Sequence, residues 1–396
     1  MTNYKNTPVL RFKEFEGEWE MKQLRTITTI NPKTSNLADS FIYIDLESVN
    51  SGSLLKENLI FKESAPSRAQ RVLSKNDILY QTVRPYQKNN FYFNLDGDYV
   101  ASTGYAQIRS KNNSDSNYIY HFLHTDSFVK KVLVRCTGTS YPAINSEHLA
   151  TIIINFPTVP EQQKIANFLT ATDTKIQQLR QKKELLNDYK KGVMQQIFKQ
   201  EIRFKNDVGG DFEDWEVKKL GEVGRIITGK TPSTTDENLW NGEIQFITPT
   251  DINENQKYQL NTKRYVVKTL KMNTLPKNTI IYTCIASIGK MCLSVKPCVT
   301  NQQINSLIPK KEYDNEYVYY YLLFMTPKIK SVQANTTLPI INKTEFSKFK
   351  IRLPSLPEQQ KIANFLTSID ERIGKVSDEI GEMERYKKGL LQGMFV

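Results

Sequence analysis

The most regular pattern of apolar and polar positions lies in the last stretch of the chain, residues 353–396. Apolar residues recur there at alternating steps of four and three, with polar residues between them. A 3.5-residue period kept over several heptads predicts an α-helix with a narrow apolar stripe, which is typical of a coiled coil. The apolar members of the stripe that we assign to the coil are Ile362, Leu366, Ile369, Ile373, Val376, Ile380, Met383 and Leu390.

Residues 156–200 carry the same pattern. The letters PEQQKIANFLT stand at 160–170 and return unchanged at 357–367. In both copies the proline suits the first turn of a helix, and the glutamate that follows lies near the positive end of the helix dipole. We therefore predict a second long helix, with an amphipathic helix packed on a globular core as the alternative. Its stripe consists of Ile165, Leu169, Ile176, Leu179, Leu186 and Val193.

The repetition extends beyond the two helices. YPAIN at 141–145 lies over LPIIN at 338–342, and LSKNDILY at 73–80 resembles LPKNTIIY at 275–282. The whole chain is therefore two copies of one unit, each with a variable block followed by a similar helical tail. We predict a first block at 1–155, a helix at 156–200, a second block at 201–352 and a helix at 353–396.

Each variable block mixes strand-like runs such as FIYIDL and TIIYTCI with shorter helical ones. This mixture predicts an α+β fold class, with one α/β domain in each half of the chain. Two similar units in one chain favour packing with pseudo-two-fold symmetry. Under that symmetry the long helices pair antiparallel, and we expect them to form a spacer between the two blocks.

Composition narrows the class of protein. The chain has 396 residues, of which 39% are hydrophobic, as in folded globular proteins. It contains no run of 18 apolar residues and no apolar secretory segment at its start, so we expect no membrane association. Its four cysteines form no C-x-x-C pair and its three histidines lack zinc-finger spacing. These features favour a cytoplasmic protein with reduced thiols and no bound metal.

Positive charge is concentrated in two segments. The net charge is +12, and the segment Asn255–Lys311 holds ten Lys or Arg residues with no Asp or Glu. Ser64–Leu95 in the first block is similar, with Asp77 as its only acid. Such concentrations are typical of proteins that bind a polyanion, although a merely basic solvated surface would give the same count.

With these motifs together, the chain resembles the specificity subunits of type I restriction–modification systems, the HsdS family. The resemblance rests on the duplicated PEQQKIANFL and YKKG tails, on TGKTPS at 228–233, on TNQQIN at 300–305 and on LPIIN. It implies two target-recognition domains that each read one half of an interrupted DNA site. It also implies that the two helices set the distance between the half-sites and dock the modification subunits.

The same resemblance implies that this chain is not an enzyme and binds no cofactor itself. Its implied partners are double-stranded DNA, two modification subunits that use S-adenosylmethionine, and restriction subunits that use ATP and magnesium. The residues agree, because the chain has no Pro-Pro dipeptide and so lacks the Asn- or Asp-Pro-Pro-aromatic loop of amine methyltransferases. Asp251, Glu254 and Lys257 lie in one polar loop, where chance spacing explains them better than a nuclease site.

One motif favours a different class of protein. The letters GRIITGKT at Gly224–Thr231 match the phosphate-loop pattern G-x-x-x-x-G-K-[ST]. A working phosphate loop needs a strand before it and a helix after it, whereas Pro232 and a polar run follow here. A nucleotide-binding or nucleotide-hydrolysing protein that uses this loop is therefore the alternative to a DNA-reading subunit.

The candidates for DNA contact are polar and basic residues in the turns of each block. Arginine can pair with guanine and asparagine with adenine in the major groove, and lysines serve phosphates. In the first block the candidates are Arg84, Tyr86, Lys88, Asn89, Ser102 and Tyr105. In the second block they are Lys230, Thr231, Lys263, Arg264, Lys268, Lys271, Lys277, Ser287, Lys290, Asn301, Gln302 and Gln303.

Overall fold

The computed structural model describes residues 6–33, 36–269, 272–333 and 340–396. The chain divides into two compact units, Met1–Gln181 with Ser377–Val396 (unit 1) and Lys182–Val376 (unit 2). The two predicted long helices are present as α5 (Val159–Phe198) and α9 (Leu356–Gly393). Each of these helices begins in one unit and ends in the other, so each unit contains the start of one and the end of the other.

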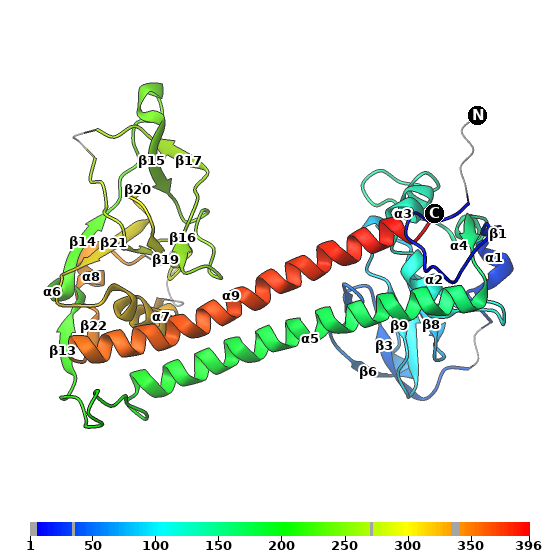
Figure 1. Cartoon of the computed structure of the whole chain (residues 1–396), viewed down its shortest axis with the longest axis horizontal. Coiled ribbons are helices and arrows are strands. Elements are labelled where there is room, and N and C mark those ends of the chain that lie inside the picture. Colours follow the sequence, from blue (N-terminus) through cyan, green and yellow to red (C-terminus); the bar gives the residue numbers. More distant parts are fainter. Residues whose placement is uncertain (1–5, 34–35, 270–271, 334–339) are drawn as a thin grey trace. The chain divides into compact units, whose positions relative to one another are not determined.

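Unit 1 contains two four-stranded sheets in its block. Figure 1 labels strands β3, β6, β8 and β9 of these sheets. Strands β3 and β10 pair in parallel, and the other neighbouring strands pair antiparallel. Every residue of the inner strand β8 is buried. The first sheet has the order β6 (Asn58–Phe61), β3 (Ser40–Ile44), β10 (Tyr99–Ser102) and β7 (Ala69–Val72). The second has the order β2 (Thr28–Ile30), β11 (Tyr105–Ser110), β8 (Asp77–Gln81) and β9 (Phe91–Phe93).

Shorter elements complete unit 1. Two small strand pairs are β1 (Glu20–Gln23) with β12 (Ile153–Phe156), and β4 (Val49–Asn50) with β5 (Ser53–Leu54). The helices of the block are α1 (Leu24–Ile27), α2 (Ser116–Phe122), α3 (Asp126–Leu133) and α4 (Ser146–Ala150), with short 3₁₀ turns η1 (Lys62–Ser64) and η2 (Pro85–Gln87). The pair β1–β12 leads directly into α5, so it fixes where the long helix leaves the block.

Unit 2 contains a five-stranded and a three-stranded sheet. The five-stranded sheet has the order β14 (Gly224–Thr228), β21 (Ile304–Pro309), β18 (Ile280–Thr283), β19 (Met291–Ser294) and β16 (Tyr258–Gln259). The other has the order β17 (Arg264–Val266), β15 (Trp240–Ile247) and β20 (Cys298–Thr300). The remaining elements are the pair β13 (Glu216–Lys219) with β22 (Lys350–Leu353), helices α6 (Leu220–Val223), α7 (Asn315–Gln333) and α8 (Lys343–Ser347), and the turn η3 (Glu237–Leu239).

The two units repeat the same topology, which confirms the α+β prediction and the internal repeat. The parallel pair β3–β10 corresponds to β15–β20, and the antiparallel pair β8–β11 corresponds to β18–β21. The asparagine that ends YPAIN and LPIIN caps a short helix in both units: Asn145 Oδ1 accepts from His148 N, and Asn342 Oδ1 accepts from Glu345 N. Side-chain caps of this kind satisfy backbone N–H groups that the first turn leaves free. Leu338 and Pro339 of LPIIN lie outside the described residues.

The repeated glutamate of PEQQ anchors each long helix to its own block. In unit 1, Glu161 is buried, pairs with Arg11 at 2.8 Å and accepts a hydrogen bond from Trp19 Nε1 at 3.3 Å. In unit 2, Glu358 is buried and makes the equivalent contacts: it pairs with Arg203 and accepts a hydrogen bond from Trp215 Nε1. A carboxylate this deeply buried requires both a counter-charge and hydrogen-bond donors. This glutamate clamp explains why the motif occurs once at the start of each helix.

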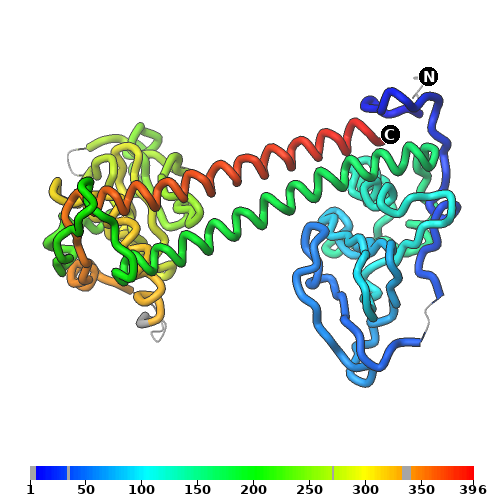
Figure 2. Tube along the Cα trace, turned by 60° about the horizontal axis from the view of Figure 1, so that its bottom comes forward, coloured from blue at the N-terminus to red at the C-terminus, as the bar shows by residue number. Residues whose placement is uncertain are grey.

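The repeated phenylalanine near the end of each tail enters a domain core. Phe395 packs against Tyr118 and Phe122 in unit 1, with ring centroids 5.3 and 5.6 Å apart. Phe198 packs against Tyr317 and Tyr321 in unit 2, at 5.7 and 5.1 Å. In unit 1 the end of α9 therefore lies beside the start of α5, as the tube in Figure 2 also shows in red and green.

The predicted apolar stripes face inward along both helices. Buried members are Ile165, Leu169, Ile176, Leu179, Val193, Ile362, Leu366, Ile369, Val376 and Leu390, and half-buried members are Leu186, Ile373, Ile380 and Met383. The ends of both stripes also join the two domain cores, so the globular-core alternative describes the ends of the helices. Within each unit the helices run antiparallel: in unit 1, for example, Asp173 pairs with Lys387 and Arg180 with Glu384.

Candidate nucleic-acid interface

The turn after β8 presents Arg84 in unit 1. Arg84 has a left-handed backbone, with φ of 53°, and its backbone N–H donates to Pro142 O. Its guanidinium carbon lies 4.1 Å from the ring centroid of Tyr141, whose side chain is exposed. A non-glycine residue in this conformation costs free energy and is common at binding sites. Stacking on Tyr141 holds the planar guanidinium in one orientation while leaving donors free for an acceptor.

The neighbouring candidates of this turn differ in whether their side chains already have a partner in the protein. Tyr86 is exposed, whereas Lys88 Nζ lies 2.6 Å from Asp126 Oδ1 in an ion pair. Asn89 Oδ1 already accepts a hydrogen bond from Ser51 N, at 3.2 Å. Arg84 and Tyr86 are therefore the side chains of this turn that are available to a ligand without breaking an existing contact.

Two candidates of the first block are corrected by the structure. Tyr105 is 1% exposed and donates its hydroxyl to Asp45 O, and Ser102 is 4% exposed on β10. The strands that carry them pair on both sides, so their side chains fill the interior of the block. Neither side chain is therefore at the surface, where the sequence analysis expected it.

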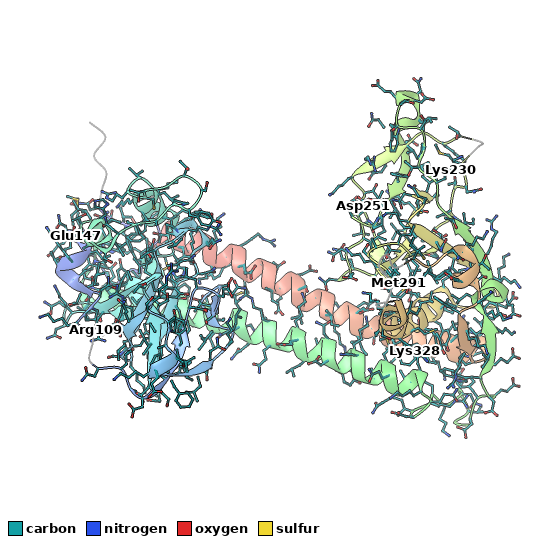
Figure 3. The ribbon with its side chains drawn as sticks, turned by 180° about the vertical axis from the view of Figure 1, so that it is seen from behind. Arg109, Glu147, Lys230, Asp251, Met291 and Lys328 are labelled. Atoms are coloured by element: carbon teal, nitrogen blue, oxygen red, sulfur yellow. The ribbon has the colours of Figure 1, made fainter. Side chains whose placement is uncertain are left out.

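Two loops of unit 2 meet at one edge of the block. Thr231 Oγ1 donates to Gln302 Oε1 at 2.7 Å, and Thr228 Oγ1 donates to Asn305 Oδ1 at 2.7 Å. Lys230 is exposed beside them, and Figure 3 shows it on the side of unit 2 away from the long helices. The predicted pair of motifs TGKTPS and TNQQIN is thus brought together, with Gln302 exposed and Gln303 half-buried. Asn301 is buried and donates to Gln303, so it positions the loop.

A second group lies on β17 and the turn before it. Lys263 and Arg264 line a groove of about 530 Å³ together with Trp240 and Tyr265. The Arg264 guanidinium lies 5.0 Å from the ring centroids of Trp240 and Phe246. Lys268 and Lys277 are exposed, and Ser287 and Lys290 are half-buried. Lys271 lies outside the described residues.

The sequence-based selection missed the aromatic supports of the two arginines. Tyr141 lies under Arg84 and Trp240 lies under Arg264, so each unit presents one arginine stacked on an aromatic ring. Tyr141 belongs to the repeated YPAIN motif, but its counterpart in LPIIN is a leucine, which hid its role. No sequence pattern pointed to Trp240, because only the pairing of β15 with β17 brings it close to Arg264.

The phosphate-loop alternative does not fit the structure. Gly224–Thr228 is strand β14, paired with β21 over its whole length, and no helix follows within residues 229–236. Residues 224–228 are therefore extended, and Gly229 N donates to Ile304 O, so this segment does not form the loop that would turn its N–H groups toward a nucleotide. Within the described residues, no group of three or more His, Cys, Asp or Glu could hold a metal ion. No described helix is long and apolar enough to cross a membrane.

Comparison with known proteins agrees with the duplicated recognition blocks. The family model "Type I restriction modification DNA specificity domain" matches residues 16–188 and again 212–383. The chain therefore belongs to the family of type I restriction–modification DNA specificity proteins, and it carries two copies of the specificity domain.

Individual relatives and solved structures are similar to this chain at low sequence identity. The MjaIX specificity subunit of Methanocaldococcus jannaschii is 32% identical over 50% of this chain and 48% of its own length, so this match spans about half of that relative. The HindI specificity subunit of Haemophilus influenzae is 24% identical over 82% of this chain and 88% of its own. The crystal structure of the S subunit from M. genitalium, at 16% identity and a TM-score of 0.62, covers 98% of this chain and 99% of its own and shares the fold.

Proposed function

We propose that this chain reads an interrupted DNA site, with each recognition block contacting one half-site, and that it performs no chemistry itself. The observation that carries the proposal is that each block presents an arginine against an aromatic ring, Arg84 against Tyr141 after β8 and Arg264 against Trp240 on β17. A guanidinium fixed in orientation can bond the O6 and N7 atoms of guanine. The family membership supports the same function.

The long helices supply the second part of the proposal. Their inner faces anchor the blocks, while their outer faces carry exposed, repeated side chains such as Tyr189 and Tyr386, at 54% and 51% exposure. Equivalent exposed positions on two helices suit two copies of one partner. We infer that they dock two modification subunits, which bring S-adenosylmethionine, and that restriction subunits bring ATP and magnesium in a cytoplasmic complex.

Block exchange tests the proposal. Residues 1–155 are replaced by the first block of another family member, and the methylated DNA sites are mapped in cells that also express the modification subunit. One half-site should change completely, while the other half-site and the spacing between them stay as they were. A simultaneous change in both half-sites would refute independent reading by the two blocks. Arg84→Ala in the same assay should relax the first half-site, whereas Lys277→Ala should leave both sequences unchanged.

A further inference from the structure

Arg71 on β7 is a half-buried arginine whose side chain has no partner among the described residues. Its Nε is buried and has no hydrogen-bond acceptor. Its two terminal nitrogens also make no ion pair or hydrogen bond with any described residue, but they are not fully buried, so a ligand can reach them. Buried donors are rarely left without an acceptor, so this guanidinium lacks a partner that the folded chain does not supply.

Half-buried arginines elsewhere in the chain show what that partner would be. Carboxylates raise the pKa of these arginines through hydrogen bonds, whereas burial alone lowers the pKa of Arg71 below its usual value. A cation that is partly removed from water without a counter-charge is unfavourable. An anion at this place would therefore be stabilising. The paired arginines are Arg11 with Glu161, Arg109 with Asp77, and Arg203 with Glu358.

The turn between β10 and β11 places Arg71 near the candidate DNA interface of unit 1. On one side of this turn, Thr103 N donates to the backbone oxygen of Arg68, whose side chain is exposed. On the other side, the carbonyl of the next residue accepts from Thr82 N, two residues before Arg84. This end of the block therefore carries Arg68, Arg71 and Arg84 near one turn, and none of the three has a carboxylate partner in the described part of the chain.

The backbone around Arg71 is irregular and lies at the edge of a sheet. Strand β7 is the last of its sheet, and within the described strands it pairs only with β10. Ala101 lies opposite Arg71 and Ser102 lies opposite Ala69, so one extra residue, Gln70, interrupts the pairing. Bulges of this kind are common at sheet edges and beside binding sites, where they redirect a side chain.

Unit 2 has no arginine at the equivalent place. The backbone N–H of Leu73 donates to β10, and that of the repeated Leu275 donates to β20, so the two segments are equivalent. Two residues before each leucine, unit 1 has Arg71 and unit 2 has Asn273. The repeated framework therefore does not need this arginine, and its role belongs to unit 1 alone.

The charge around Arg71 indicates which anion it binds. The segment Ser64–Leu95 holds five basic residues and a single acid, Asp77, which already accepts from Arg109 and Gln107. A surface of this charge attracts a polyanion. On the basis of the proposed function, we propose that Arg71, with Arg68 beside it, binds the sugar–phosphate backbone of the first half-site. Such a contact holds the DNA in register while Arg84 reads a base.

Salt-dependent DNA binding tests the proposal. The full chain, co-expressed with the modification subunit, is titrated with a duplex that carries its mapped site and with a duplex of random sequence. Arg71→Met removes the charge and keeps an apolar side chain of similar length. It should weaken binding to both duplexes by the same factor, about fivefold, and lower the slope of log K against log salt by about 1. The ratio of the two affinities and the methylated sequence should stay the same.

Matched variants complete the experiment. Arg71→Lys keeps the charge and should keep the salt slope. Lys75→Met removes a cation of the same segment that already pairs with Asp96 at 2.7 Å, and it should leave the slope unchanged. Because Arg71 has no partner in the free protein, Arg71→Met should not lower the melting temperature, whereas Arg84→Ala should lower the ratio of the two affinities.

Four results would overturn the proposal. They are an unchanged slope after Arg71→Met, an equal change after Lys75→Met, a loss of binding confined to the duplex with the mapped site, and a fall in melting temperature that accompanies the loss. The last of these would make the role of Arg71 structural. If the unaltered complex failed to bind the mapped duplex, the proposed function itself would fail, and the phosphate contact with it.

Discussion

The two units use the same contacts to hold the long helices and different contacts to fill the space beside them. Both have the glutamate clamp, both have a helix cap from a repeated asparagine, and both receive a phenylalanine from the end of a long helix. Beside the helices, however, unit 2 has the buried pair of Lys257 with Glu316, where unit 1 has a cavity. The repeated residues thus serve attachment, whereas residues of the blocks that face the same stretch of the helices, such as Glu316 and Asn117, differ between the units.

This comparison explains the unequal divergence of the chain. A clamp or a core contact constrains its residues through burial, because a change there leaves a charge or a donor unpaired or opens a void. The turn that carries Arg84 and the start of β17 that carries Arg264 lie at the surface, where replacement is tolerated. A protein that must change its DNA sequence preference while keeping its assembly would divide its residues in this way.

The largest expected effect comes from the terminal phenylalanines. Phe395→Ala should lower the free energy of unfolding of unit 1 by about 3–5 kcal/mol, and Phe198→Ala should do the same to unit 2, because each ring fills a buried aromatic cluster. Hydrogen exchange with mass spectrometry reports on each unit separately. Tyr386→Ala and Tyr189→Ala, at exposed positions of the same tails, serve as controls and should change stability by about 0.5 kcal/mol or less. Equal loss of protection in both units after either change would show that the two attachments are not local.

The glutamate clamp should give the next largest effect. Glu358→Ala leaves Arg203 without its buried counter-charge and should destabilise unit 2 by about 3 kcal/mol, and Glu161→Ala should act alike on unit 1. The matched control is Glu384→Ala, whose partner Arg180 is exposed, where about 0–1 kcal/mol is expected. Chemical denaturation followed by tryptophan fluorescence measures both, since Trp19 and Trp215 touch the clamps. A clamp variant no less stable than the control would remove the clamp as the reason for the repeated motif.

The sequence predicted the elements that repeat and missed the ones that depend on pairing between distant strands. The 3.5-residue period located α5 and α9, and the duplication predicted matching topologies. Burial of Tyr105 escaped prediction because a polar, turn-flanked stretch reads as surface until β11 is seen between two other strands. The stacking of Arg264 on Trp240 joins residues that only the β15–β17 pairing brings together. The sequence also did not predict the cavity of unit 1, because it is recognised only by comparison with unit 2, where Lys257 fills the equivalent space.

Acid should lower the stability of unit 1 more than that of unit 2, because all three histidines of the chain lie in unit 1. Burial lowers the pKa of His121 well below its usual value and the pKa of His124 to about 4, helped by Lys387 and, for His124, by Lys88. The unfolded chain binds protons on these rings near pH 6.5 and the folded chain does not, so stability is complete above that pH and falls toward pH 4. We expect unit 1 to lose about 1–3 kcal/mol over this window. Hydrogen exchange at pH 6.5 and pH 4 measures it, and earlier loss of protection in unit 2 would contradict the assignment.

The smallest expected effect concerns two ion pairs that occupy equivalent positions in the two repeats. Asp173 pairs with Lys387 in unit 1, and Lys190 pairs with Asp370 in unit 2. Each pair therefore joins the repeated aspartate of one long helix to the repeated lysine of the other. Asp370 also accepts from Tyr320 OH at 2.5 Å, whereas His121 Nδ1, at the same place in unit 1, stays 3.9 Å from Asp173. The unit 2 pair is also less exposed, with side chains at 16% and 23% against 23% and 34%.

Double-mutant cycles can measure this difference. In each unit the aspartate is changed to asparagine, the lysine to methionine, and both together, and the coupling energy is obtained from denaturation. We expect about 0.5 kcal/mol in unit 1 and about 1 kcal/mol in unit 2, because a pair that is partly shielded from water interacts more strongly than an exposed one. Tyr320→Phe should bring the unit 2 value toward that of unit 1, since it removes the extra donor that fixes Asp370. Equal couplings before that change would mean that the repeated pairs act alike, and that the divergence between the units stops short of the helices.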